Sequence, residues 1–291
     1  MKDELKSKDR LIAELAEARR ENFVLKSRLR EIDEDRENRW QVKFAEFKMA
    51  EELREEIFRI TRHDMKTPLT GIIGICECLK NEENLTADQR RVIQMLQNSG
   101  AKMLDMINVS LALHKIERNA YVLDSRRLDL LAVIRQVLEE LKKTILHKKI
   151  DVRLRLDDRE LGRGEKIIVH GEELLCYAML ANLIKNALEA SPKEGEVQVL
   201  VTTGCGQLGV EIVNSGSVPE DVRDRFFEKY ATSGKRCGTG LGTYSAKLIA
   251  EAHGGEIEMQ TSGESVSVKV TFPVPVPALR RERDRAVAEE A

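Results

Sequence analysis

Three groups of residues in this sequence could do chemistry together. His63 heads the segment HDMKTPL, and a neutral imidazole is a good nucleophile near pH 7. Far downstream, Asn182 and Asn186 lie four residues apart, and a glycine-rich run, GTGLG, occupies residues 238–242. A nucleophile, a pair of amide ligands and a phosphate-binding loop, in that order, would suit the transfer of a phosphoryl group from a nucleotide to a histidine.

The two downstream groups differ in what they can bind. On a helix, Asn182 and Asn186 would share one face, and an amide oxygen can ligate Mg²⁺, which keeps most of its waters and is shared with phosphate. Glycines let backbone N–H groups approach phosphate closely, and the start of a helix adds favourable partial charge. Taken singly, each signal is ambiguous, because an Asn in an apolar helix can be a satisfied core amide. The glycine run also lacks the lysine of a P-loop.

Bulk composition limits the class of protein. The 291 residues suggest about two domains, and the 34% of charged residues with only 4% of aromatics favours long, solvated helices. A net charge of −2 argues against a nucleic-acid binder dominated by phosphate contacts. The five cysteines lack metal-ligand spacing, which favours inert thiols in a reducing compartment. Without an apolar run of bilayer length or a signal peptide, the chain is expected to be cytoplasmic and to contact no membrane.

Residues 1–49 have the pattern of a coiled coil. Apolar residues alternate at steps of four and three, with Asn22 on the same seam, and the seam is interrupted at Arg36 and Arg39. Such a break locally unwinds a coiled coil. The segment is therefore either a plain dimerisation rod or a signal-carrying helix whose twist or register changes.

Residues 50–120 are predicted to form a helical hairpin. The first helix runs through His63 to about Leu79, and Pro68 in its interior predicts a bend just after His63. A polar turn follows, and Thr86 is the expected N-cap of a second helix of about thirty residues. One hairpin cannot cover its own apolar stripe, so two chains are expected to pair as a dimeric four-helix bundle.

Residues 121–275 mix helices and strands in the manner of a two-layer α/β sandwich, which makes the whole chain an α+β multidomain protein. The expected helices are 128–146, 172–190 and 241–252. The expected strands are 150–156 and 166–170, with hairpins at 197–203/208–214 and 256–261/265–272. The stretch from about 215 to 237 reads as loop, and the charged tail, 276–291, is expected to be mobile.

Together these segments resemble the sensor histidine kinases of two-component signalling, over about residues 50 to 275. The resemblance implies a dimeric phosphoacceptor hairpin joined to a GHKL-type ATP-binding domain, with ATP and Mg²⁺ as cofactors. The matching segments are the His63 flank (phosphoacceptor box), residues 182–190 (N box), 214–219 (first glycine box), Phe226 and Phe227 (F box) and 238–242 (second glycine box).

The resemblance also implies roles for single residues. His63 would be phosphorylated, and Asp64 would orient or deprotonate its imidazole. Asn186, assisted by Asn182, would hold Mg²⁺, and Lys235 would contact phosphate from a lid. The backbone of Gly238, Gly240, Leu241 and Gly242 would receive the triphosphate, and Asn214 with Gly216 would meet the base. Thr67, one turn after His63, would orient a water that dephosphorylates the partner; the alternative is an ordinary polar residue before a proline.

Asn214 departs from the family pattern, which has Asp at this position. An amide oxygen can still accept a hydrogen bond from the adenine amino group, but without charge assistance, a loss of about 1 kcal/mol. The sequence therefore predicts weakened ATP binding rather than a dead site. Because an amide also donates, it further predicts relaxed selectivity against GTP.

The implied partners are a second copy of the chain and the receiver domain of a response regulator. The helix face below His63 is the expected docking surface for the regulator, and the alternative is a plain solvated face; the face comprises Thr70, Gly71, Gly74 and Glu77. Two rival functions stay open: a degraded kinase that acts as phosphatase or phosphotransfer scaffold, and a coiled-coil protein with an ATP-driven switch.

Overall fold

The computed structural model describes residues 64–157, 159–162, 164–204, 206–232 and 240–273, with a few helical positions before residue 51. His63, Lys235 and Gly238 lie outside the described residues, as do most of the expected coiled coil and the charged tail. The chain divides into two compact units, Met1–Gln97 and Asn98–Ala291. Within the described parts, no helix combines the length and apolar character needed to cross a membrane.

The first unit contains the helical residues 64–80, a turn and the start of helix α2 (Ala87–Glu117). Thr86 caps α2 as predicted. Its hydroxyl accepts a hydrogen bond from the N–H of Gln89 at 3.2 Å, and the Gln89 side chain accepts from the N–H of Thr86 at 2.9 Å. This reciprocal capping box satisfies two backbone donors that the helix itself cannot, and it fixes where the second helix begins.

The same unit leaves apolar side chains on its surface. Cys76 and Ile93 are buried, whereas Cys78, two residues along, is exposed, as the helical period requires. Met65, Ile72 and Leu79 on the helical residues 64–80 are exposed in this single chain. The other exposed apolar residues of this unit's hairpin are Ile75, Val92, Met95 and Leu96. A lone hairpin thus fails to cover its apolar surface.

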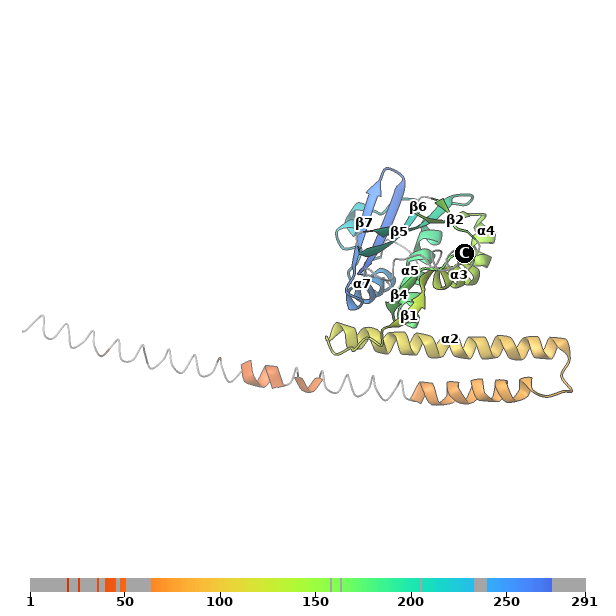
Figure 1. The fold of residues 1–291 in the computed structure, drawn as a ribbon. Coiled ribbons are helices and arrows are strands. Elements are labelled where there is room, and N and C mark those ends of the chain that lie inside the picture. The colour runs from red at the N-terminus through yellow and green to blue at the C-terminus, as the bar shows by residue number, and fades with distance from the viewer. Residues whose placement is uncertain are drawn as a thin grey trace, which may run out of the picture. The chain divides into compact units, whose positions relative to one another are not determined.

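The second unit is built on a six-stranded sheet, in the order β3-β2-β5-β6-β8-β7 (Figure 1). Strands β2 and β5 pair in parallel and the other neighbours are antiparallel. The strands are β2 (Asp151–Leu156), β3 (Arg159–Glu160), β5 (Glu196–Gly204), β6 (Gln207–Ser215), β7 (Glu256–Ser262) and β8 (Ser265–Pro273). A separate two-stranded ladder joins β1 (Arg126–Asp129) to β4 (Ile168–Gly171).

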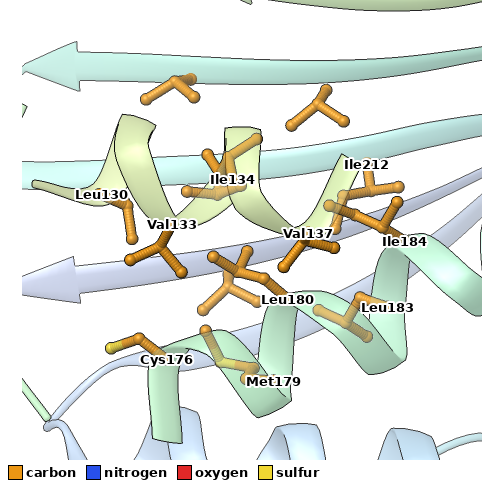
Figure 2. Close-up of a cluster of buried hydrophobic side chains, with 14 of the residues drawn as sticks. Leu130, Val133, Ile134, Val137, Cys176, Met179, Leu180, Leu183, Ile184 and Ile212 are labelled. Atoms are coloured by element: carbon orange, nitrogen blue, oxygen red, sulfur yellow. The ribbon is translucent and has the colours of Figure 1, made fainter. Parts of the chain in front are cut away.

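Helices cover one face of the sheet. They are α3 (Leu130–Glu140), α4 (Lys142–Lys148), α5 (Glu173–Ala190), the short α6 (Glu220–Arg223) and α7 (Gly242–Ala252). Alternate residues of β5, Val197, Val199 and Val201, are fully buried. Figure 2 shows apolar side chains of α3 and α5, among them Ile134 and Leu180, turned toward one another in front of the strands. The expected α+β sandwich is confirmed.

One predicted element was wrong. The sequence suggested a single helix over 128–146, but the structure has β1, then α3 and α4 separated at Leu141. The Asp129 carboxylate explains the late start, because it accepts from the N–H of Leu131 at 3.2 Å and of Ile167 at 3.1 Å. It therefore caps α3 and ties that end to the segment before β4. The short helix α6 also lies in a region expected to be loop.

Candidate active site

The two asparagines lie where α5 meets the start of α7. Both occupy the half-buried side of α5, whose opposite side fills the core. A Cβ atom placed on Gly242 would lie 3.6 Å from Asn186 Nδ2 and 3.8 Å from Asn182 Oδ1. The structure therefore brings together the amide pair and the glycine run, which the sequence separates by more than fifty residues.

The glycine run enters α7 through a backbone that only glycine suits. Gly240 has φ +65°, and its carbonyl accepts a hydrogen bond from the N–H of Tyr230 at 3.0 Å. A Cβ at Gly240 would come within 2.6 Å of the Tyr230 backbone. Helix α7 begins at Gly242 without a side-chain cap, and Leu241 before it is 36% exposed. No side chain therefore caps the first N–H groups of α7, and uncapped N–H groups at a helix start can bind anions.

The F-box segment is tied to the same helix. The Thr243 hydroxyl donates to the carbonyl of Phe226 at 2.7 Å, and Phe226 meets Phe227 edge to face at 5.0 Å between ring centroids. The Ser245 hydroxyl donates to the Leu241 carbonyl at 2.6 Å. The Thr243 bond holds the start of α7 against the segment that precedes residues 233–239, and the Ser245 bond stays within the first turn of α7. Thr243 and Ser245 were missed from the sequence, although hydroxyls directly after a glycine run are a usable signal.

Asn214 and Gly216 lie at the end of β6, beside the end of α5. Asn214 is only 5% exposed, and its Nδ2 donates to the carbonyl of Ser215 at 3.1 Å. Gly216 has φ +151°, and a Cβ there would lie 3.2 Å from the Ala190 carbonyl oxygen. A side chain at Gly216 would therefore push β6 away from α5. The described parts of the N box and of both glycine boxes converge around α5.

The donor set fits a magnesium ion that is shared with phosphate. No group of three or more His, Cys, Asp or Glu among the described residues could hold a metal. Two amide side chains beside an uncapped helix start provide few protein ligands of their own. Mg²⁺ prefers this kind of site, because it keeps several waters and takes substrate phosphates as ligands.

The strongly perturbed groups away from this site are structural. Burial raises the pKa of the Cys176 thiol to about 12, which makes it inert. Burial also lowers the pKa of His253, whose Nδ1 lies 2.8 Å from the Ile249 carbonyl. Because that carbonyl only accepts, Nδ1 carries the proton and Nε2 accepts from the N–H of Glu172 at 3.1 Å. His253 is thus a satisfied core histidine.

Asp64 and Thr67 lie in the other unit, exposed on the helical residues 64–80. Their roles stay predictions, together with those of His63, Lys235 and Gly238, which fall outside the described residues.

Comparison with known proteins gives two domain matches. Residues 53–119 match the His Kinase A (phospho-acceptor) domain, and residues 171–277 match the histidine kinase-, DNA gyrase B- and HSP90-like ATPase family. The chain belongs to the sensor histidine kinases. The two matches fall on the expected phosphoacceptor hairpin and on the unit that contains the convergent site.

Similar sensor histidine kinases include the sensor protein VanS of Enterococcus faecium, 24% identical over 81% of this chain and 61% of that protein. The aerobic respiration control sensor protein ArcB of Escherichia coli is 29% identical over 78% of this chain and 29% of that protein. A crystal structure of full-length ShkA in complex with AMPPNP shares the fold, with a TM-score of 0.53 and 24% identity over 77% of this chain and 47% of that chain. The chain thus spans less than two thirds of each of these proteins.

Proposed function

We propose that this protein is an ATP-dependent protein-histidine kinase that phosphorylates itself on His63 and passes the phosphoryl group to an aspartate of a response regulator. The observation that carries the proposal is the convergence of Asn182 and Asn186 with the glycine run at the uncapped start of α7. The ATPase-family match and the AMPPNP complex of the similar ShkA support a nucleotide as the ligand of this domain.

The chain's residues divide the reaction between two units. A nitrogen of the His63 imidazole attacks the γ-phosphorus, the bond to the β-phosphate oxygen breaks, ADP leaves, and the imidazole proton passes to Asp64. The Gly240–Gly242 backbone and the start of α7 would hold the phosphates, since such transfer depends mainly on positioning and charge neutralisation. Asn186, with Asn182 beside it, would hold Mg²⁺, which neutralises charge on the phosphates when bound.

The Asn214 amide bears on nucleotide selectivity. A carbonyl only accepts, so the contact with Ser215 assigns Nδ2 to that bond and leaves Oδ1 as the group that can meet an adenine amino group. Relaxed selectivity toward GTP would require the amide to turn over and give up this bond. We therefore expect ATP to be preferred, and Asn214→Asp to tighten ATP binding by about tenfold or less. Competition between ATP and GTP in both proteins tests this, and equal competition by GTP in the parent protein would contradict it.

We also propose a homodimer joined through the hairpin. The exposed Met65, Ile72 and Leu79 follow a seven-residue repeat, and a second hairpin would bury them. Sedimentation of the full chain should give twice the monomer mass, and Ile72→Asp should shift it toward monomer.

The resemblance to the family supports two further proposals, a response regulator as partner and a phosphatase role for Thr67. Thr67→Ala should slow dephosphorylation of a phosphorylated receiver domain and leave phosphorylation of His63 nearly unchanged. A cytoplasmic location stays a prediction.

The central experiment incubates the full chain with γ-labelled ATP and Mg²⁺, beside His63→Gln as control. Label that is acid-labile and absent from His63→Gln supports the kinase. Nucleotide binding without label in either protein would instead favour the phosphatase or scaffold alternative. ATP hydrolysis that is unchanged in His63→Gln, without label, would favour the ATP-driven switch.

A further inference from the structure

The last turn of α2, which lies within the second unit, ends in a carboxylate that contacts residues on both sides of the glycine run. Glu117 is the final residue of α2, where the partial negative charge of a helix end disfavours an acidic side chain. Its Oε1 lies 2.7 Å from Lys229 Nζ, and its side chain is only 25% exposed. The Tyr244 hydroxyl also hydrogen-bonds to Glu117. The end of α2 therefore disfavours the negative charge of Glu117, and the contacts with Lys229 and Tyr244 offset this cost.

These two partners flank the glycine run on either side. Lys229 directly precedes Tyr230, whose N–H donates to the Gly240 carbonyl at 3.0 Å. Tyr244 lies in the first turn of α7, two residues after Gly242. Lys229 Nζ also lies 5.1 Å from the centroid of the Tyr244 ring. The Glu117 carboxylate thus contacts one residue from each of the two segments that flank the Gly240–Gly242 backbone.

The end of α2 is itself firmly placed in this unit. Ala112 is 6% exposed and belongs to the main apolar core, and Leu113 and Ile116 pack against it. The contact also raises the pKa of the Lys229 ammonium, chiefly through its hydrogen bond with Glu117. Both the apolar packing and the ion pair therefore place Glu117 in the same compact unit as the described part of the glycine run.

We propose that Glu117 is a positioning residue for the phosphate-binding backbone, so that nucleotide affinity depends on the conformation of the end of α2. The inference rests on the proposed nucleotide site. Coupling between two sites is reciprocal, so bound nucleotide should in turn hold the last turn of α2 in place. The conformation at the end of the hairpin that carries His63 would then depend on whether nucleotide is bound.

The test measures ADP–Mg²⁺ dissociation constants of the full chain by calorimetry, with Glu117→Gln as the main variant. A partly exposed ion pair changes an equilibrium by about fivefold at most, so we expect binding weakened about threefold to fivefold. The matched control is Lys102→Ala, which removes another ion pair of α2, between Lys102 and Glu140 at 2.6 Å, without touching the glycine run. That variant should bind with the parent's affinity.

A charge exchange separates positioning from general stability. Combining Glu117→Lys with Lys229→Glu should recover affinity to within about twofold of the parent, because the ion pair is restored and the tyrosine hydroxyl can donate to a carboxylate on either segment. Unchanged affinity in Glu117→Gln, or equal weakening in Lys102→Ala, would overturn the inference. Absence of nucleotide binding by the parent protein would instead overturn the proposed function.

Discussion

Lys148 stabilises the C-terminal end of α5, the helix that carries Asn182 and Asn186. Its Nζ donates to the carbonyls of Leu188, Glu189 and Ser191 at 2.8, 2.9 and 3.0 Å. The last carbonyls of a helix lack partners within the helix, and a cation there also meets the partial negative charge of the helix end. We predict that Lys148→Met, which keeps much of the side-chain volume, destabilises the protein.

The size of the effect follows from these contacts. Hydrogen bonds from a charged donor contribute about 1.5–3 kcal/mol, and a cation at a helix end adds about 0.3–1 kcal/mol. Because Lys148 is only half-buried, we expect a loss near the lower end, about 2 kcal/mol. For a unit of this size that corresponds to a fall in Tm of about 4–8 °C.

Thermal unfolding followed by circular dichroism measures this loss, with Lys142→Met as the matched control. Lys142 starts the same helix α4, and its ion pair with Glu139 is 57% and 71% exposed, so its loss should change the free energy of unfolding by less than about 0.5 kcal/mol. Equal Tm values for the two variants would refute the reasoning that the hydrogen bonds from Lys148 stabilise the end of α5.

Three further predictions concern single residues. Gly240→Ala should weaken nucleotide binding by about tenfold or more, because an L residue at φ +65° is strained and its Cβ would meet the Tyr230 backbone. Its control is Gly204→Ala, where an added Cβ has nothing within 4 Å, and this variant should bind normally in the same calorimetric titration. Thr86→Ala should lower the free energy of unfolding of the hairpin by about 1 kcal/mol in a denaturant titration, and Thr86→Ser should retain it. Burial lowers the pKa of His253 in the fold, partly offset by the hydrogen bond to the Ile249 carbonyl and by Glu172, so the unfolded chain binds its proton first. The free energy of unfolding should therefore fall as pH drops below about 6.5, and His253→Gln should flatten that slope in melts between pH 7.5 and 5.5.

The sequence predicted elements whose cause is local. The N-cap at Thr86 and the hairpin of residues 197–203 and 208–214 both depend on neighbours in the chain. The late start of the predicted 128–146 helix depends partly on a distant residue, because the Asp129 carboxylate that caps α3 also accepts from the N–H of Ile167, thirty-eight residues away. No glycine or proline marks the separation of α3 from α4 at Leu141, so that break carries no clear sequence signal.

The site shows the same division. Residue types and spacing selected Asn182, Asn186 and the glycine run as candidates, because phosphate and Mg²⁺ chemistry restricts which residues can serve, and the family resemblance added Asn214. Lys148 and Glu117 could not be found this way. A lysine at a helix end and a glutamate before a loop are common surface residues, and their roles depend on which distant carbonyls or cations the fold places beside them.

The strength of the α2 contacts has a functional consequence. The ion pairs Lys102–Glu140 and Glu117–Lys229 are both partly exposed, so each contributes at most about 1 kcal/mol. The apolar contacts of Ala112, Leu113 and Ile116 with the main core therefore account for most of the attachment of the end of α2. The Glu117–Lys229 pair instead affects how the residues beside the glycine run are positioned. A loss of up to about 1 kcal/mol there changes a binding equilibrium by about fivefold, so under the proposed function a small displacement of the end of α2 is enough to alter nucleotide affinity.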